Sequence, residues 1–190
     1  HLGYRNFGGL LTALGRNDEA EAMLLKAQSL NPTARGWSNL GTLYIFDQQY
    51  AKAVPVLEKA VESMQKEAPN DYLVWGNLGD AYWLSGAPTD KTRSAYRHAV
   101  EVAERQSPAT ADVTGALAEY YAKLGDKVGA RTRIESSLKT SPDSASARYQ
   151  AGIVYAILGD EDRALRELKD ALTRGYAVDQ LRKAPELTKL

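Results

Sequence analysis

The residues best suited to catalysis are carboxylates that gather at two places in the chain. They are Glu19 and Glu21, followed much later by Asp160, Glu161 and Asp162. Paired carboxylates can serve as general acid and general base when their surroundings set their pKa values apart. Both groups, however, lie where helices are expected to begin, and the helix dipole stabilises negative charge at that end. We therefore interpret them as solvated helix caps, and we predict no catalytic residue.

Other side chains that carry chemistry are scarce. The chain has two histidines and no cysteine, which excludes disulfides, a thiol nucleophile and thiolate metal sites. His98 lies between Arg97 and Ala99 in an expected helix, where a surface or packing role is the simpler interpretation. The glycines do not form a phosphate-binding loop. The sequence thus predicts a protein that is not an enzyme and that binds no metal or cofactor.

A short pattern returns along the chain and organises these residues. Each copy has a bulky residue, then a Leu-Gly-like pair, then an aromatic residue or a leucine. The copies run over 4–11, 37–44 and 75–82, with weaker ones around 117–121 and 151–155. Spacings of three and four residues place these side chains on one face of a helix. A period in the thirties predicts stacked repeats, which make extended surfaces more often than active sites.

Each copy continues with a second half of matching design. A glycine marks the turn in every copy except the second, where Gln48 stands instead. A small residue, a large apolar residue and another small residue follow, at helical spacing. Gly41 and Gly79, in the first halves of their copies, are expected where the two helices of a pair touch.

These residues resemble the tetratricopeptide repeat family over essentially all 190 residues. The order Trp, Leu-Gly, Tyr, Ala, large apolar, Ala, Pro matches the pattern of that family. The departures from it are Thr114, Arg148, Ala118 and Gln48. The resemblance implies an all-α, right-handed superhelical solenoid of about five antiparallel helix pairs with a short C-terminal helical cap. A single solenoid is expected, with repeats 1–33, 34–71, 72–110, 111–144 and 145–177, and a cap over 178–190.

Local signals refine the helices that we expect, about eleven in all. The predicted N-caps are Ser107 followed by Pro108, Ser141 followed by Pro142, Asp126, and Asp160. Good helix formers fill 62–67 and 101–105. The second helices of repeats two and three should therefore run about one turn longer than the others.

Composition excludes several classes of partner. The net charge is zero, so general nucleic-acid binding is not expected. The longest apolar stretch, 152–158, is far too short to span a membrane, and no signal peptide is recognised. We expect a soluble protein; its compartment stays open, with the cytoplasm favoured over the periplasm. The chain begins at His1 almost inside the first expected helix, which suggests a piece of a longer protein with His1 as a tag remnant.

The resemblance also implies which residues face a partner, because in this family the first helices of the repeats line a concave groove. The residue before the Leu-Gly-like pair is asparagine in three successive copies, at Asn6, Asn39 and Asn77. An asparagine amide offers both a donor and an acceptor, so it can bind a peptide unit in both directions. Proteins of this family that bind extended peptides use such ladders. The alternative is that these asparagines satisfy the backbone of a neighbouring helix.

Trp83 is the most distinctive residue expected in this groove. Trp37 and Trp75 occupy the packing position of the pattern, whereas Trp83 does not, so partial exposure beside Ile45 and Phe46 is expected. Exposed tryptophan is frequent among the residues that dominate binding energies. The alternative is that Trp83 packs against the long second helix of a neighbouring repeat.

The predicted groove combines these features in a scaffold for protein–protein interaction. It contains Asn6, Asn39, Thr42, Ile45, Phe46, Asn77, Asp80, Trp83, Glu119 and Tyr149. Asp80, Glu119 and Asp112 make its middle acidic, which favours a protein or peptide partner with basic residues beside a hydrophobic anchor. The residues that clamp a C-terminal carboxylate in one subtype are mostly absent, since Arg5 and Gly9 stand at their places.

Two further functions stay open at this point. The stretch from Arg174 to Leu187 is similar to the closing segment of repeat arrays in bacterial signalling proteins. In those proteins the array lies behind a serine/threonine kinase or a winged-helix domain, and the chain would then be a regulatory or sensor region. Alternatively, it would be a self-association module that forms homo-oligomers.

Overall fold

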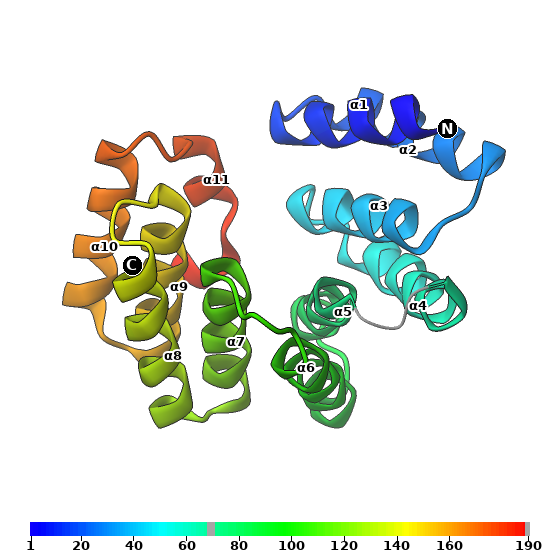
Figure 1. Cartoon of the computed structure of the whole chain (residues 1–190). Coiled ribbons are helices and arrows are strands. Elements are labelled where there is room, and N and C mark those ends of the chain that lie inside the picture. Colours follow the sequence, from blue (N-terminus) through cyan, green and yellow to red (C-terminus); the bar gives the residue numbers. More distant parts are fainter. Residues whose placement is uncertain (68–70, 189–190) are drawn as a thin grey trace. The chain divides into compact units, whose positions relative to one another are not determined.

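The computed structural model describes residues 1–67 and 71–188, and this part of the chain is a succession of helices without strands (Figure 1). The α-helices are α1 (Leu2–Ala13), α2 (Asn17–Leu30), α3 (Ala34–Phe46), α4 (Tyr50–Glu67), α5 (Tyr72–Leu84), α6 (Thr89–Glu104), α7 (Ala111–Leu124), α8 (Lys127–Thr140), α9 (Ala145–Leu158), α10 (Glu161–Thr173) and α11 (Val178–Lys183). A short 3-10 helix, η1 (Pro185–Leu187), follows them. The predictions of an all-α fold and of about eleven helices are confirmed.

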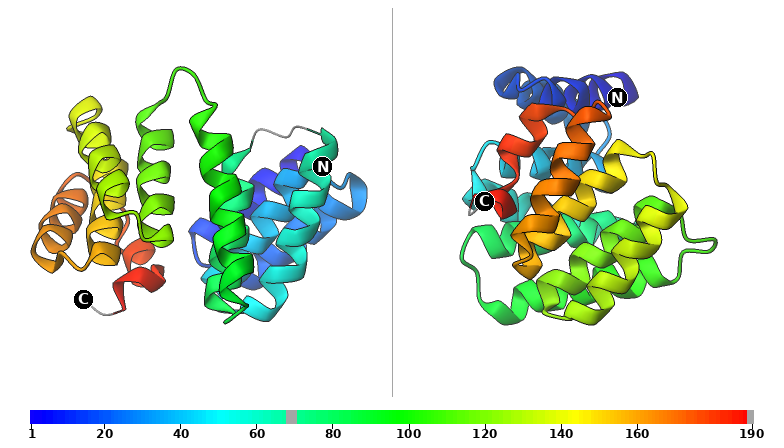
Figure 2. Two further views of the ribbon diagram at one scale, coloured as in Figure 1. Left: turned by 90° about the horizontal axis from the view of Figure 1, so that it is seen from below. Right: turned by 90° about the vertical axis from the view of Figure 1, so that its left-hand side faces the viewer.

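The contacts divide the chain into two compact units, unit 1 over His1–Ala99 and unit 2 over Val100–Leu190. In unit 1, α1 packs on α2, α3 on α4, and α5 on α6. In unit 2, α7 packs on α8, α9 on α10, and η1 on α9. The first helices of successive pairs are also neighbours, because α3 contacts α1 and α5, and α7 contacts α9 (Figures 1 and 2).

The apolar positions of the repeat form the core of each unit. In unit 1 the most deeply buried large side chains are Leu11, Leu24, Leu40, Leu43, Leu57, Met64, Val74 and Tyr96. In unit 2, Ile134 and Val154 have no exposed surface and pack among buried alanines. The pattern of small and large residues read from the sequence therefore corresponds to the packed interfaces between helices.

Glycine in the Leu-Gly-like pair lets the two helices of a pair touch. A Cβ atom added to Gly41 would lie 2.4 Å from Cγ of Leu57, and one added to Gly79 would lie 2.5 Å from Cε1 of Tyr96. The equivalent pairs elsewhere are Gly8 with Leu24 and Gly152 with Leu168. The predicted position of Gly41 and Gly79, at contacts within a repeat, is confirmed.

The turns between paired helices each use one residue in the left-handed region. The residues there are Gly15, Gly86, Gly125 and Gly159, with φ of 72°, 72°, 87° and 77°. Gln48 takes the same conformation in the second pair, with φ of 58°. A residue with a Cβ atom meets the following carbonyl oxygen in this region, which costs roughly 1–2 kcal/mol.

Replacing Gln48 with glycine is expected to raise the free energy of unfolding by about 0.5–1 kcal/mol. The change relieves the left-handed strain, but it also adds backbone entropy to the unfolded chain, which offsets part of the gain. Urea unfolding followed by circular dichroism measures the difference. The matched control is Gly125→Ala, which introduces the same strain at φ 87° and should lower stability by about 1 kcal/mol. Two changes of the same sign would contradict the prediction.

Two of the four predicted caps are correct and two are wrong. Asp126 accepts a hydrogen bond from the backbone N–H of Gly129 at 2.9 Å, and Asp160 is the cap of α10. The two Ser-Pro pairs do not cap helices; Thr110 caps α7 and Ser144 caps α9 instead. In both cases a hydroxyl three residues beyond the serine accepts from the third backbone N–H of the helix, and this bond fixes the later start.

The predicted extra length of two second helices is confirmed for one of them. Helix α4 has 18 residues, against 14 in α2 and in α8, so it is one turn longer. It continues past Pro55, which lies inside it. Helix α6 has 16 residues and ends at Glu104, so its gain is about half a turn. Arg105, expected in this helix, lies in the turn that follows it.

Candidate functional site

Most residues of the predicted groove lie on three neighbouring helices of unit 1. Asn6 is on α1; Asn39, Thr42, Ile45 and Phe46 are on α3; and Asn77, Asp80 and Trp83 are on α5. Since α3 packs on both of the other helices, we call this set of side chains the α1–α3–α5 face (Figure 1). Glu119 and Tyr149 belong to unit 2, on α7 and α9, and are described separately below.

The three asparagines of the expected ladder have different surroundings. Both amide hydrogens of Asn77 are used, because Nδ2 donates to Oγ of Ser38 and to Oγ1 of Thr42, each at 3.1 Å. Thr42 in turn donates to the carbonyl oxygen of Ser38 at 3.0 Å. Asn39 is half-buried and Asn6 is exposed. In this arrangement Asn77 offers a ligand only its carbonyl oxygen, and part of its role is to join α5 to α3.

Trp83 is the most exposed aromatic side chain of this face. Its exposed fraction is 47%, which confirms the expectation of partial exposure. Ile45, at the equivalent position of α3, is half-buried and packs against the core of unit 1, and Phe46 is also half-buried. The tryptophans at the packing position are engaged differently: Trp75 stacks on His98 with ring centroids 4.5 Å apart. His98 thus has a packing role, as expected.

Asp80 and two tyrosines form hydrogen bonds that the repeat pattern does not indicate. The hydroxyl of Tyr96 donates to Oδ1 of Asp80 at 2.6 Å, which fixes the ring that packs on Gly79. Tyr82 donates to Glu58 on the preceding helix at 2.7 Å. Burial, together with this bond, raises the pKa of the Tyr82 hydroxyl to about 12.

An analogous bond joins α3 to the second helix of the first repeat. Tyr44 donates to Oε1 of Glu21 at 2.6 Å, and burial is the main reason that its pKa lies above the usual value. Glu21, considered at first as a candidate for acid–base chemistry, therefore acts as the acceptor of a structural bond between repeats. The tyrosine of the repeat pattern signals the donor, but the pattern does not specify which carboxylate accepts.

The two predicted residues of unit 2 are engaged by other parts of the same unit. Glu119 pairs with Lys123 at 2.7 Å, and Lys123 also pairs with Glu186 of η1 at 2.9 Å. The ring of Tyr149 stacks on that of Tyr176, with centroids 4.2 Å apart and an interplanar angle of 13°. Burial, the neighbouring Tyr176 and the nearby carboxylates raise the pKa of Tyr149 above its usual value.

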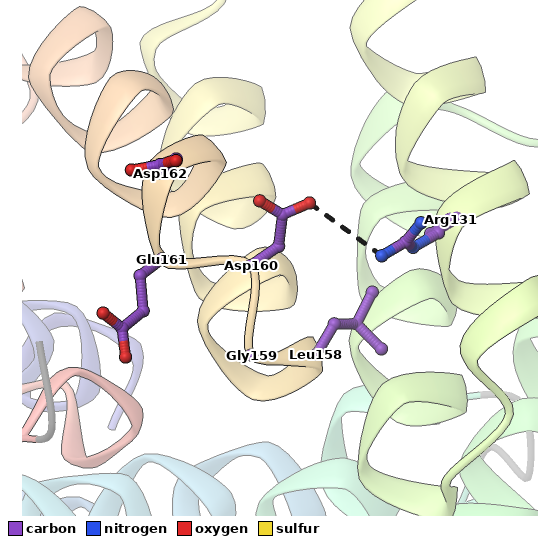
Figure 3. A pocket seen from close by; sticks show the side chains of 6 residues that line it. All are labelled: Arg131, Leu158, Gly159, Asp160, Glu161 and Asp162. Atoms are coloured by element: carbon purple, nitrogen blue, oxygen red, sulfur yellow. Dashed lines mark ion pairs between the residues drawn. The ribbon is translucent and has the colours of Figure 1, made fainter.

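A small open pocket lies at the turn between α9 and α10, and it does not contain any residue of the predicted groove (Figure 3). Its lining comprises Arg131 from α8 and the run from Leu158 to Asp162. Asp160 points toward Arg131, with 3.9 Å between its Oδ2 and Nη2 of the arginine, and it also caps α10. These contacts match the interpretation of the acidic run as a helix start.

Membrane insertion by a helix finds no support in the described part of the chain. None of the helices over 1–67 and 71–188 combines the length and the apolar composition that a bilayer crossing requires.

Comparison with known proteins identifies the repeats and the fold. Family models described as tetratricopeptide repeat match residues 4–33, 34–63 and 116–179. A thermophilic tetratricopeptide repeat protein of Thermus thermophilus is 22% identical, with a TM-score of 0.69 and 98% of each chain covered. A tetratricopeptide repeat protein from Parabacteroides merdae is 20% identical, with a TM-score of 0.64, over 95% of this chain and 67% of that one. No curated protein matches the sequence significantly.

Proposed function

This chain belongs to the tetratricopeptide repeat family, whose repeats typically form scaffolds for protein interaction, and we propose that it binds an extended segment of a partner protein on the α1–α3–α5 face. The observation that carries the proposal is the exposure of Trp83, at 47%, on a helix where the neighbouring Ala81 and Tyr82 are buried. Keeping a large apolar ring in water is unfavourable, and tryptophan is enriched among residues that dominate binding energies. Trp83 would bind an apolar side chain of the partner, next to Ile45 and Phe46.

Asparagines would hold the backbone of the bound segment. Asn77 would accept a hydrogen bond from a peptide N–H through Oδ1, since both of its donors already bond to α3. Asn39 and Asn6 make no side-chain hydrogen bond with another described residue, so each could present a donor and an acceptor. Binding through the backbone is largely independent of the partner's sequence, so selectivity would come from the apolar anchor and from charge.

Charge favours basic residues in the partner. Asp80 brings a carboxylate to the face, where it accepts a hydrogen bond from Tyr96. Glu119 belongs to unit 2, where it is paired with Lys123. We therefore propose a partner segment with lysine or arginine beside a hydrophobic anchor, and no catalytic step, since this face brings together no nucleophile with a general base among the described residues.

The proposal predicts a preference that synthetic peptides can measure. Three labelled peptides share one leucine or phenylalanine anchor, flanked by lysines, by glutamates or by serines. The lysine-flanked peptide should bind the full chain at least tenfold tighter than the glutamate-flanked one, as measured by fluorescence anisotropy. Its advantage should shrink with added salt, because screening weakens interactions between exposed charges. Equal affinities, or tighter binding of the glutamate-flanked peptide, would contradict the proposed partner.

Other expectations from the sequence stay predictions. A single solenoid over 1–190, the five repeat boundaries and self-association into homo-oligomers are among them. The same holds for the similarity of the C-terminal stretch to bacterial signalling proteins, and for a regulatory or sensor role. The exposed tryptophan on a first helix favours a binding role for this face over a purely structural one.

A further inference from the structure

The chain of unit 2 returns onto its own first helices after α10. Helix η1 packs on α9, and Oε1 of Glu186 lies 2.9 Å from Nζ of Lys123 on α7. Nearer to α10 in the same stretch of chain, the ring of Tyr176 stacks on Tyr149 of α9. Figure 2 shows the segment, coloured red, passing beside α7 and α9. We call residues 176–188 the return segment.

The return segment covers the positions that a ligand would occupy on the first helices. Lys123 stands on α7 where Phe46 stands on α3, and Glu119 stands where Asp80 stands on α5. The α7–α9 face of unit 2 is therefore already occupied, with a carboxylate on its lysine and an aromatic ring on its tyrosine. This inference goes beyond the proposed function, which concerns only α1, α3 and α5.

The return segment is held mainly by individual side chains, because its helices contribute little to the core. Neither α11 nor η1 contains a buried residue or a side-chain cap. Its anchors include the ring of Tyr176, the buried Ala184 and the carboxylate of Glu186, which forms a buried ion pair with Lys123. Helices α11 and η1 bury little apolar surface, so displacement depends mainly on breaking this buried ion pair and does not require the helix pairs beneath the segment to unfold.

We infer that the return segment is an intramolecular ligand of the α7–α9 face, and that a partner binds this face by displacing it with an acidic segment of its own. The ammonium group of Lys123 keeps Glu119 as one partner and would take a second carboxylate in the place of Glu186, and the ring of Tyr149 offers a stacking surface to a group that replaces Tyr176. Because the return segment is tethered, its effective concentration is in the millimolar range, and a weak external segment does not compete with it.

The test uses the full chain and a labelled synthetic peptide with the sequence of residues 176–188. Wild type should bind this peptide weakly, because its own segment occupies the face. The variant Glu186→Gln weakens that occupant and leaves Lys123 in place, so it should bind the peptide at least tenfold tighter in fluorescence anisotropy. Tyr176→Ala loosens the other anchor and should act in the same direction, which keeps the test decisive if the first variant folds poorly.

Three controls separate this mechanism from a general loosening of the fold. Lys123→Gln also breaks the ion pair but removes the group that the peptide needs, so it should bind no tighter than wild type. Glu161→Gln removes an exposed carboxylate of α10 that makes no ion pair with a described residue, and it should behave as wild type does. A peptide with glutamine in place of its glutamate should not gain affinity for Glu186→Gln. Equal peptide affinity of wild type, Glu186→Gln and Tyr176→Ala would overturn the inference.

The occupant must also belong to the same molecule. Light scattering at increasing concentration should give wild type and Glu186→Gln the same mass. A dimer that dissociates in Glu186→Gln would show that the segment is exchanged between two copies, and the intramolecular assignment would be wrong.

Discussion

Replacing Gly79 with leucine should lower the free energy of unfolding by about 1–3 kcal/mol, the usual range for overpacking a close contact. A Cβ atom at this position would lie 2.5 Å from Cε1 of Tyr96, a ring that is 2% exposed. The ring cannot easily turn aside, because its hydroxyl is hydrogen-bonded to Asp80 at 2.6 Å. Relief would require α5 and α6 to separate. The urea midpoint, followed by circular dichroism, measures the loss.

Gly9 provides the matched control for this substitution. It also lies inside a first helix, but a Cβ atom there would meet nothing within 4 Å. Gly9→Leu should therefore leave stability unchanged or raise it by about 0.5–1 kcal/mol, because glycine disfavours the helix. If Gly79→Leu unfolded at the same urea concentration as wild type, the assignment of Gly79 to a tight helix contact would be wrong.

The repeat spacing predicted the helices and their contacts because it records the geometry of close packing. A glycine that recurs at one fixed place of the repeat is useful where a second helix touches it, as Gly41 and Leu57 show. The turn within each repeat was equally predictable, since its short connection uses one left-handed residue, a conformation that favours glycine. Even the exception, Gln48, adopts that conformation. These features follow from backbone geometry, which many different side chains can satisfy.

Features that depend on a choice between similar side chains were not predictable. Thr110 and Ser144 cap helices that Ser107 and Ser141 were expected to cap, and all four hydroxyls can make such a bond. The stabilising free energies of competing caps differ by less than the contribution of one cap, about 1 kcal/mol. The sequence could not rank them, because the outcome depends on how the preceding chain leaves the repeat before it.

In the candidate site, too, the features set by the repeat pattern were predictable, whereas those that depend on particular neighbouring side chains were not. Exposure of Trp83 follows from its place outside the packing register, and the structure confirms it. The use of both Asn77 donors by Ser38 and Thr42 depends on two neighbours that no repeat pattern specifies. Glu186 meets Lys123 across a long stretch of chain, and the sequence contains no periodic signal for that contact.

Replacing Trp83 with alanine should weaken binding of the lysine-flanked peptide by about 2 kcal/mol, or roughly thirtyfold in Kd, as truncation of a dominant binding residue does. The melting temperature should change little, because the side chain is 47% exposed and lies outside the core of unit 1. Trp37→Ala serves as the comparison. Trp37 packs against that core, so this variant should lose stability instead. Calorimetric titration and thermal melting on the same preparations give both quantities. A Trp83→Ala protein with unchanged affinity and a large loss of stability would identify Trp83 as a packing residue, and the binding site would then have to lie away from α5.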